Sequence, residues 1–516
     1  MKKNAIYFGL AVMSLLTVGC STGSYEESYP LDYYANYVGD RGEKGDKGAT
    51  GAQGPDGGMP TQQGGDKFEE FADNPFVKTS QQPISTFSVD ADGASYAIMR
   101  RYLNNGWNVE PSSVRIEEFL NYFTFNYPSP VGSETVAINA EVGECPWNTE
   151  HQLLRLGIKG KELKASEMPK ANFVFLIDVS GSMASKDKLD LLKTGLSTLV
   201  DQLNPEDRIS IITYAGEVEK LLESTPVKEA AKIKASINKL APSGCTAGGK
   251  ALQMAYEEAL SNYDPSANNR IIMGTDGDFN VGVTSTDALV EMVESYATKG
   301  IYMTCLGFGS GNLNDAMMEQ ISNYGNGTYH YIDCEDEMMK VLVHERERFV
   351  SVANDAKCQV TFNQDIVSEY RLIGYENRVM NSEDFENDKK DAGEIGAGQT
   401  ITALYELVID KDALQKGVSS NGTFATFDFR YKKTLQSESH PLQLKLTADR
   451  ITNKNGRSDD FYFAAGIAAY GMILRDSPYK GEADLDLAQK LLKTGLTFDP
   501  HGYRADLLKL MDKIKN

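Results

Sequence analysis

The chain has 516 residues, of which 41% are hydrophobic and 9% aromatic, so it can bury a substantial core and is not a disordered protein. It carries 73 acidic against 52 basic side chains, which gives a formal net charge of -21 at pH 7. This balance disfavours non-specific binding to nucleic acid or to anionic lipid, and it favours solubility and the binding of cations.

Residues 1–20 predict a secretory leader. Two lysines precede an apolar run at 5–18, which is too short to span a bilayer and which ends at Gly19 and Cys20. Small residues before a cysteine resemble the lipobox of bacterial lipoproteins, although Thr17 stands where leucine is usual. The resemblance implies acylation of Cys20 and a lipid anchor in a bacterial envelope, with the outer membrane favoured and its periplasmic face or the cell surface both open. A cleaved signal without lipid and an uncleaved anchor are the alternatives.

Residues 21–75 are rich in Gly, Asp, Gln, Ser and Tyr and lack a sustained apolar period, which predicts a flexible tether. Within it, residues 39–57 place glycine at every third position, as collagen does because only glycine fits at the axis of its triple helix. The run holds a single proline, Pro55, so any trimer would be weak. A solvated tether is the favoured interpretation, and a short trimer-forming stalk is the alternative.

Apolar runs alternate with helical patterns across residues 170–349. The segment "NFVFLIDVSGSM" begins with an apolar run at 173–177, as expected for a strand buried on both faces. Further strands are predicted at "RISIITYA", "RIIMGTD" and "IYMTCLGFG", with helices at 228–240, 248–262 and 287–298. Such alternation indicates parallel βαβ units, and hence an α/β fold with a doubly wound, mostly parallel sheet.

Residues directly after the strands of such a sheet matter most, because ligands bind at the carboxyl ends of the strands. Five side chains with oxygen donors fall in three of these loops: Asp178, Ser180, Ser182, Thr246 and Asp276. Two carboxylates and three hydroxyls form an all-oxygen set that suits Mg²⁺, Mn²⁺ or Ca²⁺ and suits zinc or copper poorly. The sequence therefore predicts a divalent-cation site at this edge of the sheet.

This arrangement resembles the von Willebrand factor type A domain and its metal-ion-dependent adhesion site. The resemblance rests on the D-x-S-x-S of "DVSGS", the separate threonine and the later Thr-Asp-Gly, each at the matching place in the topology. It implies that Ser180, Ser182 and Thr246 coordinate an ion, Mg²⁺ first, directly or through water. Asp178 and Asp276 would orient the waters and hydroxyls around that ion. One coordination position stays open, and a partner's Asp or Glu fills it in this family.

Segments on both sides, among them "PISTFSVDADGASYAIMRRYLNNG" and "FYFAAGIAAYGMILRDSPY", resemble the flanks of a bacterial subfamily of such proteins. Residues 95–125 and 459–515 have helical patterns, whereas "CQVTFNQ", "ITALYELVI" and "FATFDFRY" alternate as half-buried antiparallel strands do. We expect the α/β domain to be inserted beside a β-sandwich that strands near 135–160 complete. The expected regions are an N-terminal flank at 76–165, the α/β domain at 170–349, a sandwich region at 350–448 and a C-terminal helical region at 455–516.

The sequence contains no complete catalytic motif among those that we considered. Residues 244–250 match GxxxxGK, but Ala251 stands where a Ser or Thr would hold Mg²⁺, and a helix rather than a strand precedes them. The chain has five histidines, none beside a candidate nucleophile in a motif, so hydrolase chemistry is unsupported. We expect a protein without enzymatic activity.

Two functions remain. The first is an envelope-anchored, divalent-cation-dependent module of adhesion type, which recognises an Asp or Glu on a protein partner and touches the membrane only through its N-terminal lipid. The alternative is a structural or assembly scaffold of the envelope, in which the metal site only stabilises loops. Neither includes nucleic acid as a partner.

Overall fold

The computed structural model describes residues 65–244, 248–277, 286–453 and 455–514. Cys20, the glycine-repeat run at 39–57 and Thr246 lie outside the described residues, so lipidation, the tether and the threonine ligand stay predictions. Within the described ranges, every helix is too short or too polar to cross a membrane.

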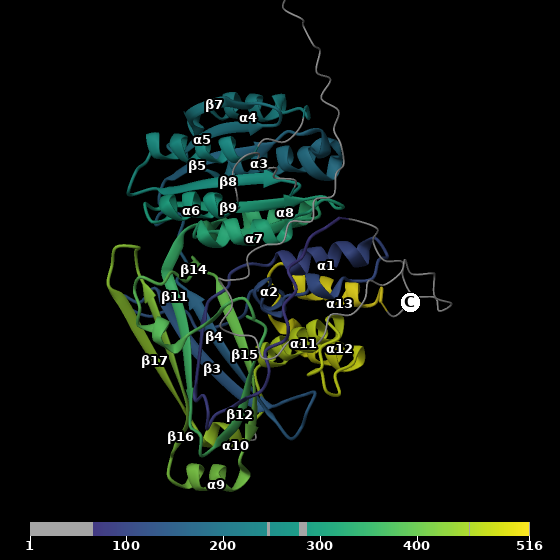
Figure 1. The fold of residues 1–516 in the computed structure, drawn as a ribbon, viewed down its shortest axis with the longest axis vertical. Helices are drawn as coiled ribbons and strands as arrows, with labels where there is room; N and C mark the ends of the chain where they lie inside the picture. Colours follow the sequence, from purple (N-terminus) through teal and green to yellow (C-terminus); the bar gives the residue numbers. More distant parts are fainter. Residues whose placement is uncertain (1–64, 245–247, 278–285, 454, 515–516) are drawn as a thin grey trace, which may run out of the picture. The chain divides into compact units, whose positions relative to one another are not determined.

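The α/β domain is built on a six-stranded sheet with the strand order β10-β9-β8-β5-β6-β7 (Figure 1). Its strands are β5 (Ala171–Asp178), β6 (Arg208–Tyr214), β7 (Val218–Pro226), β8 (Asn268–Thr275), β9 (Ile301–Phe308) and β10 (Thr328–Ile332). All neighbours pair in parallel except β7, which runs antiparallel to β6. Every residue of the central strand β5 is buried, as its apolar run predicts.

Helices cover both faces of this sheet, which confirms the doubly wound, mostly parallel α/β fold. One face packs against α3 (Leu191–Gln202), α4 (Ala230–Lys239) and α8 (Glu335–Met339), and the other against α5 (Gly248–Ser261), α6 (Thr286–Ala297) and α7 (Asp315–Tyr324). Alternate residues of β5 serve the two cores: Phe173 and Phe175 join the first, and Val174 and Leu176 join the second. The edge strand β7 was not predicted, because most of its residues are exposed or half-buried.

The β-sandwich consists of two antiparallel sheets, with strand orders β1-β12-β15-β4-β3 and β13-β2-β11-β16-β17. Its strands are β1 (Val77–Lys78), β2 (Ile84–Ser88), β3 (Val136–Glu144), β4 (Gln152–Gly160), β11 (Ser351–Phe362), β12 (Val367–Ile373), β13 (Val379–Met380), β14 (Gly393–Gly396), β15 (Thr400–Ile409), β16 (Thr423–Lys432) and β17 (Ser439–Thr447), with β14 paired to β11. The helices α9 (Lys411–Ser419) and α10 (Asp449–Thr452) are attached to it. The chain leaves the sandwich after β4 and returns at β11, so the α/β domain is an insertion between two sandwich strands.

A helical region brings the N-terminal flank together with the last described helices. It contains α1 (Ala94–Asn104), α2 (Ile116–Asn121), α11 (Asp459–Leu474), α12 (Leu485–Thr494) and α13 (Tyr503–Met511). The two faces of α1 serve different cores: Ala97 and Ile98 pack in the α/β domain, whereas Met99 and Leu103 pack in the helical region. The N-terminal flank therefore fastens the inserted domain to the rest of the described body.

Candidate metal centre

The two motif carboxylates lie at the carboxyl edge of the sheet, on neighbouring strands. Asp178 is the last residue of β5, and Asp276 directly follows β8, which pairs with β5 in parallel. Both side chains are fully buried, at 0% exposure, and Ser180 is buried beside them. Ser182 is exposed. The centre therefore has an exposed serine hydroxyl on its outer side and two buried carboxylates beneath it.

Asp178 shapes the turn that carries the two serines. Its Oδ1 accepts the backbone N–H of Ser180 at 2.8 Å, and its Oδ2 accepts the hydroxyl of Thr275 at 3.1 Å. A carboxylate that bonds the backbone two residues on fixes such a turn. Burial raises the pKa of Asp178 to about 6, and the hydrogen bonds from Ser180 offset part of this rise. With both oxygens engaged in bonds to the protein, Asp178 suits the orienting role that the resemblance implies.

The serine oxygens have a spacing that fits one small cation. Ser180 Oγ and Ser182 Oγ lie 2.9 Å apart and share a hydrogen bond. Two neighbouring ligands of an octahedral Mg²⁺, each at about 2.1 Å from the ion, lie about 3.0 Å from each other. The residues therefore fit a hard divalent cation held by hydroxyl oxygens, with carboxylates behind them.

Asp276 has an ammonium partner that the sequence did not reveal. Lys188 Nζ lies 3.0 Å from Asp276 Oδ2, with the Lys188 side chain only 10% exposed. Burial alone would raise the pKa of Asp276, but hydrogen bonds from Ser182, Lys188 and Asn312 and the charge of Lys188 outweigh it and lower that pKa. Asp276 is therefore held as a carboxylate. Gly309 leaves room for the lysine, since a Cβ there would meet Lys188 Cε at 2.0 Å.

The third predicted loop reaches the same place. Gly181 donates its N–H to the carbonyl oxygen of Gly244 at 3.1 Å, and the backbone N–H of Ser243 donates to the carbonyl oxygen of Val179 at 2.6 Å. The chain just before Thr246 is thus bonded to the serine turn.

The chain enters the described body beside this centre. Residues 65–67, which we call the N-terminal strap, run along the loop 309–314 that carries Asn312, and Lys67 forms a parallel bridge with Asn314. The carboxylate of Asp66 accepts the N–H groups of Gly311 at 2.6 Å and Leu313 at 3.1 Å. It also pairs with Arg101 of α1 at 2.7 Å. The strap and the centre therefore share one loop.

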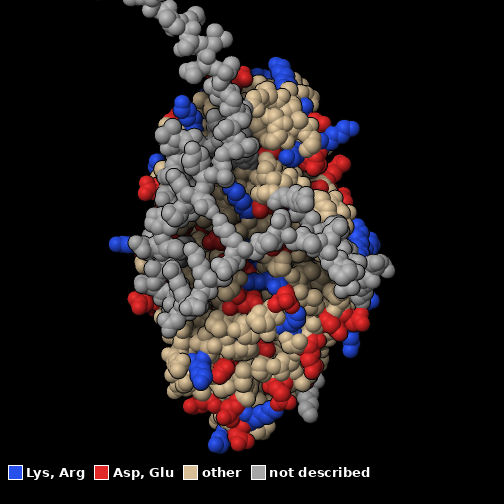
Figure 2. All heavy atoms as spheres, turned by 45° about the vertical axis from the view of Figure 1, so that its right-hand side comes forward, with Lys and Arg blue, Asp and Glu red and all other residues tan. Residues whose placement is uncertain are grey.

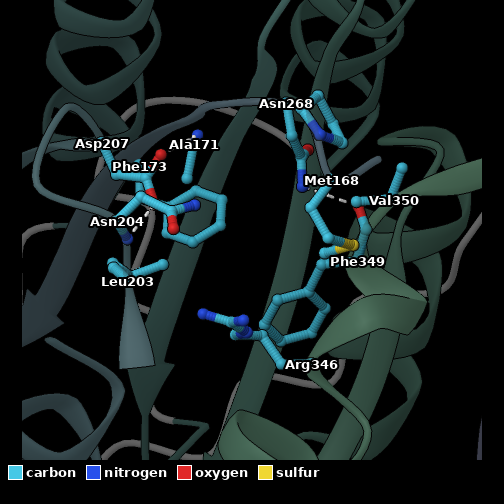
Figure 3. A pocket seen from close by; sticks show the side chains of 11 residues that line it. Met168, Ala171, Phe173, Leu203, Asn204, Asp207, Asn268, Arg346, Phe349 and Val350 are labelled. Carbon is cyan, nitrogen blue, oxygen red and sulfur yellow. Dashed lines mark hydrogen bonds between the residues drawn. The ribbon is translucent and has the colours of Figure 1, made fainter. Parts of the chain in front are cut away.

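A pocket at the opposite edge of the sheet offers little room for a ligand. It lies where β5 and β8 begin, and Figure 3 shows the rings of Phe173 and Phe349 among its walls. Its volume is about 20 Å³, which admits one or two water molecules. The pocket is remote from the metal-type residues and gives no support to a small-molecule site there.

Fold and site together define a class of protein. Residues 173–278 match the family model described as von Willebrand factor type A domain, and residues 62–155 match one described as von Willebrand factor. The chain is a bacterial protein that contains such a domain, here abbreviated VWA. The uncharacterized protein YfbK of Escherichia coli K12 is 38% identical over 469 residues, which cover 87% of this chain and 81% of that protein. Residues 347–516 match the model for the C-terminal part of YfbK. The chain belongs to the YfbK family.

Three further similarities cover only part of the chain or have low sequence identity. Human inter-alpha-trypsin inhibitor heavy chain H3 is 31% identical over 33% of this chain and 20% of its own length. Among solved structures, the von Willebrand factor type A protein of Catenulispora acidiphila covers 75% of this chain and 91% of that chain, with 16% identity and a TM-score of 0.43. A proximal thread matrix protein of the mussel byssus, described with a zinc-occupied MIDAS motif, covers 34% of this chain and 46% of that chain, with 21% identity and a TM-score of 0.30. MIDAS denotes the metal-ion-dependent adhesion site.

Proposed function

We propose that this chain is an envelope-anchored module that binds a protein partner through a divalent cation, Mg²⁺ first. The observation that supports the proposal is the difference in exposure between the carboxylates and a hydroxyl of the centre. The carboxylates of Asp178 and Asp276 are fully buried, and the hydroxyl-bearing Ser182 over them is exposed. A cation held there has its outer side toward solvent and is open to a ligand from another molecule.

The residues of the centre have different roles in binding the cation and the partner. When bound, the cation supplies a positive charge to which a carboxylate of the partner can attach. Ser180 and Ser182 offer uncharged oxygens, which leave that charge largely uncompensated, and the resemblance adds Thr246 to them. Asp178 fixes the serine turn through its bonds to Ser180 and Thr275, and Asp276 accepts a hydrogen bond from Ser182. The ligand recognised is therefore an Asp or Glu side chain.

The charge of the protein sets the salt dependence. The net charge of -21 opposes the approach of an acidic partner over long distances. At physiological salt this repulsion is screened beyond about 8 Å. On the described side chains of the face in Figure 2, acidic and basic groups are interspersed rather than separated into fields of one sign. Binding should therefore survive moderate salt.

The decisive experiment measures partner capture from envelope extract in four conditions: buffer, moderate salt, EDTA, and EDTA followed by excess Mg²⁺, Mn²⁺, Ca²⁺ or Zn²⁺. We expect capture to survive salt, to disappear with EDTA, and to return with the preferred cation. It should also be lost in folded Thr246→Ala and Asp276→Ala variants, and when one Asp or Glu of the partner is changed to its amide. Capture that ignores EDTA and both substitutions would replace this proposal with the scaffold function.

The anchor is tested separately. If Cys20 is acylated, wild-type protein should enter the detergent phase on phase partition and the Cys20→Ala variant should stay in the aqueous phase. Cys145→Ala is a suitable control, since that thiol is fully buried in the helical core. Equal partition of wild type and Cys20→Ala would refute lipidation.

A further inference from the structure

A second group of acidic side chains lies where the VWA domain, the N-terminal flank and the sandwich meet. Asp90 follows β2, Glu118 belongs to α2, and Glu319 belongs to α7 of the VWA domain. All three are buried, and one carboxylate oxygen from each lies within 4.8 Å of the other two. Oxygens that share a Ca²⁺ at 2.3–2.6 Å are at most about 5 Å apart. We call these three residues the junction cluster.

Two arginines neutralise only part of the charge at this junction. Arg378 bonds Asp90 Oδ2 at 2.9 Å and Glu319 Oε1 at 2.8 Å, and Arg115 bonds Glu118 Oε1. Five carboxylates surround these two guanidinium groups, each at most 7% exposed: Asp90, Asp92, Glu118, Asp315 and Glu319. Buried negative charge in excess of its partners is costly unless a cation or a proton balances it.

Each residue of the cluster has one carboxylate oxygen that is not hydrogen-bonded to Arg378 or Arg115. Asp90 Oδ1 accepts the backbone N–H of Asp92 at 2.8 Å, and Glu118 Oε2 accepts that of Ser95 at 2.8 Å. Each of these oxygens has a second lone pair for a further ligand. Glu319 is only 7% exposed, and its Oε2 is buried without a hydrogen-bond partner among the described residues. A buried carboxylate oxygen without a partner is rare and calls for a ligand.

We propose that the junction cluster binds one divalent cation of the Ca²⁺ type, held by Asp90, Glu118 and Glu319. The ligands are carboxylate oxygens throughout, which is the donor set of Ca²⁺ sites. None of the three belongs to the candidate metal centre at the carboxyl edge. Because the ligands come from α7, from α2 and from the segment between β2 and α1, the ion joins the inserted domain to the flank. This site would serve stability and the fixed placement of the VWA domain, whatever the first site binds.

The test counts Ca²⁺ per chain by isothermal titration calorimetry on full-length protein that carries Asp178→Ala, so that the first centre is disabled. We expect one Ca²⁺ per chain and a Ca²⁺-dependent rise in the unfolding temperature. Adding Glu319→Gln removes the charge but keeps an oxygen for Arg378, and it should weaken Ca²⁺ at least tenfold. Asp90→Asn provides the same test if that variant does not fold.

Glu337→Gln is the matched control. Glu337 is also buried, at 3% exposure, and is bonded to Arg100 and Tyr122 instead of to the cluster. In the Asp178→Ala protein this substitution should leave the Ca²⁺ affinity unchanged. Folded Asp178→Ala protein that binds no Ca²⁺ at millimolar concentration, or a Glu319→Gln variant that binds it as tightly, would overturn the proposal. Arginines and protons would then balance the cluster.

Discussion

Ser182 is the residue through which the centre meets solvent, and it offers a sharp comparison with a neighbour. Ser185 is exposed in the same stretch of chain but lies outside the motif. Mg²⁺ should stabilise wild-type and Ser185→Ala protein by about 2.7 kcal/mol at 100 times its dissociation constant. Ser182→Ala should lose most of this gain, because a ligand oxygen is missing. Thermal unfolding with and without Mg²⁺ measures both, and an equal gain in the two variants would contradict the assignment.

Lys188 occupies a position where its charge competes with a metal for Asp276. Lys188→Met removes a buried ion pair and should lower the stability of the metal-free protein by about 3 kcal/mol. The same change should tighten Mg²⁺, because the carboxylate then has less positive charge beside it. Titration calorimetry and unfolding in EDTA test the two effects, with exposed Lys186→Met as the control. Weaker Mg²⁺ binding in Lys188→Met would show that the ammonium supports the site instead.

The common location of Asp178, Ser180, Ser182 and Asp276 was predictable from sequence, whereas the contacts of Lys188 and Asn312 with it were not. A D-x-S-x-S after an apolar strand and a Thr-Asp-Gly after another mark their own loops, and topology brings those loops together. Nothing local distinguishes Lys188 from the lysines around it. Its role depends on Gly309 leaving room for its side chain, and that contact joins residues far apart in the sequence.

Among the elements, the buried parallel strands were the most predictable, because a strand covered on both faces reads as a continuous apolar run. The short strands β1 and β2 were not predicted. β2 pairs with β11 in the middle of a sandwich sheet and lies only five residues before α1. A segment this short shows too few periods for its pattern to be read, and only its pairing partner, more than 260 residues later, gives it a structure.

The N-terminal strap is an element whose attachment can be measured. Asp66 accepts the amides of Gly311 and Leu313, and a hydrogen bond to a charged group contributes about 1.5–3 kcal/mol. Asp66→Asn should therefore speed hydrogen exchange at these two amides by about tenfold or more. Asp73→Asn is the control, since Asp73 lies just after the strap in the sequence but pairs with Arg475 instead of with the loop 309–314. Unchanged exchange at residues 311–313 in Asp66→Asn would show that the strap does not hold this loop.

At the scale of the whole molecule, stability should depend on pH through a buried acid of the flank. Burial first, and then the charges of Glu376 and Asp90, raise the pKa of Glu117 from 4.5 to about 8. Between these pH values the folded protein holds a proton that the unfolded chain releases. The free energy of unfolding should therefore fall as pH rises from about 4.5 to about 8, by at most about 1.4 kcal/mol per pH unit from this group.

Glu117→Gln tests this directly. The amide cannot ionise, so denaturant unfolding of the variant should lose that share of the slope and gain stability relative to wild type as pH increases. The exposed Glu383→Gln should leave the slope as it is in wild type. A Glu117→Gln protein with the wild-type slope across this window would show that other groups set the pH dependence.

The shared loop of strap and centre has a mechanical consequence. If the chain is anchored through Cys20, any load between the membrane and a bound partner is carried along the chain through residues 65–67. Residues 65 and 67 bond the loop 309–314 of the VWA domain directly, and Asn312 of this loop bonds Asp276. Tension on the chain would thus act on a loop that bonds a residue of the cation site. The strength of the adhesion would then depend on the force that the protein bears.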